Sequence, residues 1–261
     1  MSIKRLSDDL LKIWAITEKD IKMYYLKSPS IFFGIVFPLI LYFTFAMGRP
    51  CVTEAHRLTG VVTVSALFGA TSVEAVVFSL ERRSRTMDRL LVAPIHPGAL
   101  IFGKAVSGAL FGFIVAIIVG AILMLFGSSW RWTGLMPGLK LEPITFMIAV
   151  FLTSIVSSSL GMIFSVKARD ITEAMWPLNV IRFLMIFICG VFIPLDETFA
   201  FMPSAKFIAY LFPITYSVEA LMQATFGIVQ PRRLLLDFLA LIFFSATFLM
   251  IAVKIFNRSI R

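Results

Sequence analysis

The chain has few charged residues and few cysteines. Only 15% of its 261 residues are charged and two are cysteines, whereas 59% are hydrophobic. With only Cys51 and Cys189, a disulfide framework or a cysteine metal site is excluded, and no bridge between the two is expected. The hydrophobic content exceeds what the core of a soluble domain needs. The chain is therefore expected to be a membrane protein.

The sequence also lacks the motifs of the common catalytic sites. It contains no phosphate-binding loop of the form G-x-x-x-x-G-K-[ST], so this chain is not expected to hydrolyse a nucleotide. His56 and His96 have no metal-ligand partner at a useful spacing, and the apolar segments contain no paired aspartates or zinc motif. We therefore expect neither an enzyme nor a metal site.

Apolar runs of about 20 residues, long enough to cross about 30 Å of hydrocarbon, identify the membrane-spanning helices. An all-α membrane protein with six such helices is expected. The first run contains Pro38, which a membrane helix tolerates with a kink. The six expected spans are residues 30–48, 59–80, 105–127, 144–166, 174–195 and 233–256.

Residues 1–29 alternate apolar and charged faces, which is typical of an amphipathic helix. The segment is not a cleavable signal peptide, and we expect it to lie flat on the membrane surface. A soluble amphipathic helix is the alternative. The apolar stripe consists of Leu6, Leu10, Ile13, Trp14, Thr17, Ile21 and Tyr24.

Residues 81–104 form a short, basic island between the second and third apolar runs. Glu81, Arg85 and Arg89 follow one another at i,i+4 spacing, and Met87 with Leu90 supplies an apolar edge. This pattern predicts a short amphipathic helix in a loop on one face of the membrane. The alternative is that the basic residues only fix the orientation of the chain.

The distribution of Lys and Arg predicts which side of the membrane each loop occupies. With a cytoplasmic N-terminus, sixteen of the 24 basic residues lie inside, seven lie outside and Arg182 lies within a span. This bias favours cytoplasmic termini. Because the net charge of +9 is concentrated in these loops, it indicates a membrane surface and not a nucleic acid as the partner.

Two further features concern packing. Small residues repeat every fourth position in the third span, at Gly108, Gly112, Ala116 and Gly120, which allows another helix to approach closely, either within the chain or in a second subunit.

Residues 196–231 are apolar but are interrupted by prolines and Lys206. We expect short re-entrant helices there, surrounded by protein or a water-filled cavity.

Glu74 and Arg182 are charged residues within expected spans. Both lie at similar depths when residues are counted from Glu81 and Glu173, so we expect them to face each other inside the protein. The alternative is that each is solvated separately, with Arg182 reaching toward the cytoplasm and Glu74 protonated or wetted by a transport pathway.

The basic loop resembles the hallmark segment of ABC-2 type transporter permeases. The resemblance lies in the order Glu81, basic cluster, Thr86, Asp88, Leu90-Leu91, Ala93-Pro94-Ile95 and Gly103-Lys104. In that family the segment is a cytoplasmic coupling helix seated in a groove of the ATPase subunit; the family usually has Gly where this chain has Arg85. The resemblance implies that the ATPase-docking residues are Glu81, Arg82, Arg83, Arg85, Thr86, Asp88, Arg89, Leu90 and Leu91.

The tail of the chain extends the same resemblance. Residues 189–227 are similar to the family's region of extracellular re-entrant helices, and residues 1–29 to its connecting helix. The resemblance thus implies one ABC-2 type transmembrane domain over residues 1–261, located in the cell membrane.

The resemblance also implies a function and partners. It implies an exporter permease for a hydrophobic or amphipathic drug, lipid or glycan, which binds a separate ATP-binding cassette subunit that holds ATP and Mg, and which pairs with a second permease, as a homodimer or a heterodimer. The alternatives are an ion- or proton-coupled secondary transporter, for which Glu74 and Arg182 would be the coupling charges, and a membrane assembly protein that transports nothing. No repeated halves and few intramembrane acids disfavour the secondary transporter.

Overall fold

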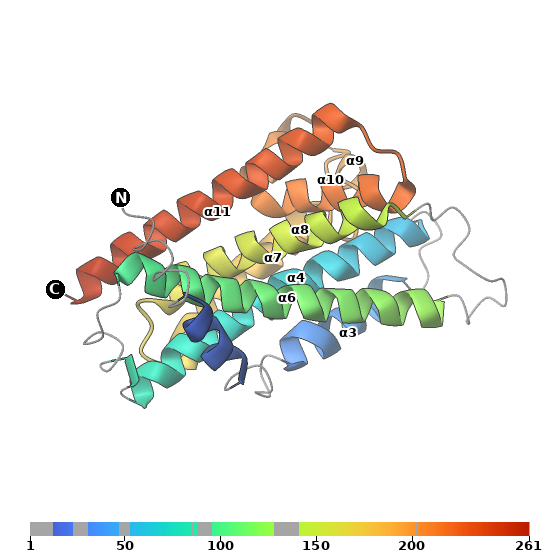
Figure 1. The fold of residues 1–261 in the computed structure, drawn as a ribbon. Coiled ribbons are helices and arrows are strands. Elements are labelled where there is room, and N and C mark those ends of the chain that lie inside the picture. The colour runs from blue at the N-terminus through green and yellow to red at the C-terminus, as the bar shows by residue number, and fades with distance from the viewer. Residues whose placement is uncertain are drawn as a thin grey trace.

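The computed structural model describes residues 13–22, 31–46, 53–84, 86–87, 96–127, 141–201 and 203–260. Within these ranges every regular element is a helix, and the long helices run side by side as one bundle (Figure 1). Such an arrangement satisfies the backbone hydrogen bonds of a membrane protein inside each helix. The prediction of an all-α fold is therefore confirmed.

Helix α4 (Glu54–Arg83) forms the centre of the bundle. Thr53 caps its first turn, where its hydroxyl accepts a hydrogen bond from the His56 backbone N–H at 3.3 Å. Its apolar section is buried along its whole length, mainly against α6 (Pro97–Gly127) and α7 (Pro143–Ser165). A helix enclosed in this way has no lipid-facing stripe.

Small residues allow these close contacts. A Cβ atom at Gly112 of α6 would lie 2.7 Å from the Cβ of Ala70 and 2.9 Å from the carbonyl oxygen of Ala66, both on α4. Gly161 of α7 is close to the backbone of Thr71 in the same way. The small-residue ladder therefore packs within the chain, against α4.

The first apolar segment begins with a π-helical turn, η1 (Phe32–Val36), and continues as α3 (Phe37–Ala46). Pro38 lacks a backbone N–H, and its ring would clash with the carbonyl of Gly34 in a regular helix. The wider turn, in which the Phe37 N–H bonds to Phe32 O, avoids this clash. The expected kink is thus a π-turn.

Among the described residues, five helices are long and apolar enough to cross a membrane: α4, α6, α7, α8 (Ile171–Ile188) and α11 (Pro231–Ile260). The described part of the first segment, residues 32–44, is shorter than a full span. The chain is a multi-pass membrane protein, while the sixth span remains a prediction.

The segment expected to be re-entrant consists of α9 (Leu195–Thr198), a 3₁₀ helix η3 (Pro203–Leu211) and α10 (Pro213–Phe226). Pro213 occupies the first position of α10, and Gly227 ends it in a left-handed conformation with φ of 64°. Helix α10 packs against α4, α7 and α11. Protein therefore surrounds it, although its depth in a membrane remains a prediction.

The bundle has two distinct ends. The end of α4, the start of α6, the end of α7 and the end of α11 form what we term the Lys104 end (Figure 1). A helix over residues 13–22 packs there, with Ile16 in an apolar cluster that also contains Phe78, Ile101 and Phe256. Helices α9, η3 and α10 lie toward the opposite end (Figure 1).

Candidate functional site

Two buried charges join the flanks of the basic loop at the Lys104 end. Lys104 Nζ, in the second turn of α6, lies 2.6 Å from Glu81 Oε2, in the last turn of α4. Neither side chain is accessible to solvent. The pair therefore closes the base of the loop between α4 and α6.

The helix over residues 13–22 completes this cluster. Asp20 Oδ2 lies 3.4 Å from Lys104 Nζ, and Lys19 contacts both Asp20 and Glu81. Two cations and two carboxylates make the cluster formally neutral. Burial by itself lowers the pKa of Lys19, but the carboxylates of Asp20 and Glu81 outweigh it and raise that pKa above its usual range.

A second contact fixes the same helix. The Thr17 hydroxyl lies 3.0 Å from the Gly103 carbonyl oxygen, and Gly103 has no side chain to keep the backbone of Ile13 away. Trp14, on the other side of this helix, is 60% exposed. The helix thus presents Thr17 and Asp20 to the protein and Trp14 to the surroundings.

The expected ATPase-docking residues do not share one environment. Glu81 is buried in the ion cluster, so its side chain is not available at the surface. Arg82 donates hydrogen bonds to the carbonyls of Val166 and Lys167 at the end of α7, whereas Arg83 is exposed. Thr86 is half-buried and bonds to Ser84. The remaining candidates lie outside the described residues: Arg85, Asp88, Arg89, Leu90 and Leu91.

Glu74 lies in the middle of the bundle and is 1% exposed. The Ser158 hydroxyl of α7 lies 2.8 Å from Glu74 Oε1 and 2.7 Å from the Ala105 carbonyl oxygen. The Ser158 hydroxyl thus donates toward both a carboxyl oxygen of α4 and a backbone carbonyl of α6. The absent side chain of Gly108 provides the space for the Glu74 carboxyl group.

Arg182 of α8 is completely buried as well, but its surroundings are aromatic. Its guanidinium carbon lies 4.8 Å from the centre of the Phe68 ring on α4, and Nη1 donates to Asn179 Oδ1 at 2.9 Å. Its Nε and Nη2 atoms have no hydrogen-bond acceptor among the described residues.

The expected pairing of Glu74 with Arg182 is wrong, although both face the protein interior. The ion pairs of the described residues do not include this one. Arg182 instead lies beside Phe68, six residues from Glu74 and thus about 9 Å along α4. Counting residues from Glu81 and Glu173 could not show which way each side chain faces: Glu74 contacts Ser158 of α7, whereas Arg182 lies against Phe68.

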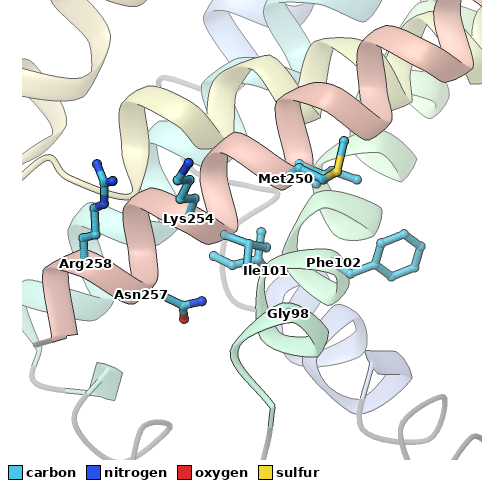
Figure 2. A pocket seen from close by; sticks show the side chains of 9 residues that line it. Gly98, Ile101, Phe102, Met250, Lys254, Asn257 and Arg258 are labelled. Atoms are coloured by element: carbon cyan, nitrogen blue, oxygen red, sulfur yellow. The ribbon is translucent and has the colours of Figure 1, made fainter. Parts of the chain in front are cut away.

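Two cavities lie at opposite ends of the molecule. The first, of about 500 Å³, lies between the start of α6 and the end of α11. Figure 2 shows Ile101 and Asn257 extending from the two helices toward each other, with Lys254 and Arg258 side by side on α11. This cavity thus combines an apolar wall with two cations.

The second cavity, of about 700 Å³, lies between α10, η3 and the first turn of α4. Tyr210 donates to Glu219 at 2.7 Å, and burial together with Glu219 raises the pKa of Tyr210 to about 12. Lys206 forms an ion pair with Asp196 at 2.6 Å. This cavity is the more polar of the two, and it lies within the segment expected to be re-entrant.

Sequence reasoning missed several residues that complete these sites: Lys19, Asp20, Ser158 and Asn179. Asp20 lies on the buried face of its helix together with Thr17. Its position next to the apolar stripe in the sequence was a signal that could have identified it as a buried acid. The partners of Glu74 and Arg182 have no comparable sequence signal.

Comparison with known proteins identifies a family. A family model described as ABC-2 type transporter matches residues 12–226, which include the basic loop, the two intramembrane charges and the segment with α9, η3 and α10. A search among curated proteins finds no match. Because the matched residues cover most of the chain, this protein belongs to the ABC-2 type transporter family, whose members are the membrane components of ABC transporters.

Proposed function

We propose that this chain is the permease subunit of an ABC exporter. It moves a hydrophobic or amphipathic substrate, of the drug, lipid or glycan class, outward across the membrane. Both of its termini lie on the cytoplasmic side. Residues 1–261 act as one transmembrane domain that pairs with a second permease. A separate ATP-binding cassette subunit binds ATP and Mg and supplies the energy.

The observation that carries this proposal is the buried ion cluster at the base of the basic loop. Glu81 and Lys104 hold the two flanking helices together, and Lys19 and Asp20 join them to the helix over residues 13–22. A force applied to the loop is therefore transmitted to α4 and α6 together, since buried ion pairs resist separation. This is the mechanical property that coupling to an external ATPase requires.

The docking candidates differ in burial, and we assign them two different roles accordingly. Glu81 and Arg82 position the helices, since one is buried and the other bonds to the end of α7. Arg83 and Thr86, together with Arg85, Asp88, Arg89, Leu90 and Leu91, form the surface that contacts the ATPase. Opposite charges and an apolar edge are the features by which such a surface recognises its partner.

The experiment is co-purification of the chain with a candidate ATP-binding cassette ATPase of the same organism, followed by measurement of hydrolysis and transport. The double charge reversal R83E/R89E is expected to reduce both the association and the coupled transport by roughly tenfold or more, because rim charges control association. The matched control is K167E/R169E, which reverses two exposed charges at the same end of the bundle.

Unchanged association and transport in R83E/R89E would contradict the docking assignment. If the wild-type chain binds no ATPase and transports nothing in an ATP-dependent manner, the permease assignment itself is wrong. Arg82 is left unchanged in both variants, since its loss would disturb α7 directly.

A further inference from the structure

The environment of Arg182 contains several buried groups that have no hydrogen-bond partner. Its Nε and Nη2 atoms donate to nothing among the described residues, and neither do the hydroxyls of Ser65 and Ser72 on α4. Ser65 precedes Phe68 by three residues and Ser72 follows it by four, so the three side chains share one face of α4. Phe68 on that face lies against the Arg182 guanidinium.

Like Ser79 further along α4, the two serines differ from most hydroxyl residues of these helices. Thr63 bonds back to the carbonyl of Thr59 at 2.8 Å, and Ser154 of α7 bonds to Val150 at 2.9 Å. Such back-bonding is the usual fate of a hydroxyl inside a helix. Ser65 and Ser72 lack this bond, and they lie on the face of α4 on which Phe68 contacts Arg182.

Burying these hydrogen-bond donors without an acceptor destabilises the fold. A guanidinium carries its charge at any physiological pH, and a buried charge without a partner is strongly unfavourable. The described residues contain no ion pair to Arg182. Glu74, the acid on the same stretch of α4, is instead engaged by Ser158. An acceptor from outside the chain would satisfy the two free nitrogens of Arg182.

Aromatic rings surround the same point. Phe37 and Phe183 both contact Phe68, with ring centres 4.9 and 6.0 Å from it. They also contact each other at 5.8 Å, which joins α3 to α8, and Phe183 is partly exposed. The site thus combines donors for an anion with an apolar surface that extends to the outside of the bundle.

We propose that Arg182 binds the anionic head group of an amphipathic transport substrate, with the hydroxyl of Ser65 or of Ser72 as a further donor, and that the apolar part of the substrate lies against Phe68 and Phe183. The substrate class is an amphiphile with a carboxylate or phosphate group. Arg is suited to this role because its fork of donors matches both groups. The inference rests on the proposed function, since it assigns the bound molecule as the cargo of a permease.

The test uses the purified chain alone, in nanodiscs of phosphatidylcholine. A diazirine-bearing palmitic acid and its methyl ester are photolysed in parallel, and the labelled peptides of α4 and α8 are quantified by mass spectrometry. The acid is expected to label residues 65–72 and 179–187 about tenfold more than the ester. Only the carboxylate of the acid can accept a charge-assisted hydrogen bond from Arg182, and the ester cannot. Dodecyl phosphate competes, whereas dodecyltrimethylammonium does not.

Variants separate a binding role from a structural one. R182Q is expected to abolish the preference for the acid, and R182K to retain part of it. S65A/S72A is expected to weaken the preference, whereas S154A, which removes a hydroxyl bonded to its own helix, leaves it unchanged. If R182Q does not fold, S65A/S72A and the wild-type comparison of acid with ester still decide the matter.

Equal labelling by the acid and the ester, or an unchanged preference in R182Q, would overturn the inference. Protection by phosphatidylglycerol in the nanodisc as strong as that by dodecyl phosphate would assign the site to a membrane lipid and overturn the assignment to cargo. Either result leaves the permease proposal intact, because that proposal is tested by ATPase association. Conversely, failure to bind an ATPase leaves the labelling result standing.

Discussion

The cluster of Lys19, Asp20, Glu81 and Lys104 concentrates four charges, of which three are fully buried and only Lys19 reaches solvent, with 28% of its side chain exposed. Burying one such charge alone costs several kcal/mol, so the arrangement is stable only because each charge faces an opposite one. Removing one member takes one of two opposite charges from each of its partners and leaves the cluster with a net charge. This asymmetry makes the cluster sensitive to single substitutions.

We predict that E81Q and K104Q each destabilise the fold by about 3–5 kcal/mol, whereas the double variant loses less than the sum of the two. The double variant leaves Lys19 and Asp20 as a neutral pair, 3.1 Å apart. Unfolding in detergent, followed by circular dichroism, measures the effect.

The matched control is the pair Glu18 and Lys22, which lies on the same helix but is exposed. An exposed i,i+4 pair contributes only about 0.3–0.5 kcal/mol, so E18Q and K22Q should have small effects. Additive losses for E81Q and K104Q would show that the two residues do not stabilise each other.

Single residues were predictable from the sequence only in part. The cost of a charge within a span predicted correctly that Glu74 and Arg182 are buried. Their partners were not predictable, because the rotation of each helix about its axis depends on how all the helices pack. Ser158 and Asn179 carry no charge, and therefore no electrostatic signal in the sequence.

At the scale of the element, the small residues of α6 were recognisable as a packing face, but the helix that they contact was not. The structure identifies α4 as that helix, and the contacts differ along the ladder. A Cβ at Gly112 would meet the backbone of α4, whereas one at Gly120 would meet a methyl group of Val62 at 3.1 Å. Only the second neighbour can adjust by turning a side chain.

We therefore predict that G112A destabilises the fold by about 1–3 kcal/mol, because α4 and α6 must separate to admit the methyl group. G120A is the control and should be close to neutral, since the intrinsic preference of Ala for helices offsets a mild contact by up to about 1 kcal/mol. Melting temperatures of the two variants in the same detergent provide the comparison. Equal melting temperatures would mean that α4 and α6 do not approach closely at Gly112.

The helix over residues 13–22 illustrates a limit of periodicity. The sequence pattern grouped Ile13, Trp14 and Thr17 as one stripe facing the membrane. In the structure Thr17 is buried against Gly103 of α6, whereas Trp14 is exposed. Periodicity identifies an amphipathic helix, but it does not distinguish a lipid surface from a neighbouring helix.

At the scale of the whole molecule, the sequence located the long helices well and their ends less well. The third span was expected to start at residue 105, because Lys104 was taken as a boundary at the membrane surface. Helix α6 starts at Pro97, and Lys104 lies inside it because Glu81 neutralises its charge. A charge can therefore end an apolar run in the sequence without ending the helix.

The orientation of the bundle gives the last prediction. The end of α4 and the end of α11 lie at the Lys104 end, and Glu197 of α9 belongs to the segment at the opposite end (Figure 1). Sixteen basic residues assigned to one side and seven to the other predict that the Lys104 end is cytoplasmic.

In a background with Cys51 and Cys189 replaced by Ser, we introduce S84C, N257C or E197C, all at exposed positions. A membrane-impermeant maleimide should label E197C in intact cells, whereas S84C and N257C should react only after permeabilisation. The permeabilised sample is the control for intrinsic reactivity, since each cysteine must react there. Labelling of S84C and N257C in intact cells, with E197C protected, would reverse the orientation and would put the basic loop on the side where no ATPase can reach it.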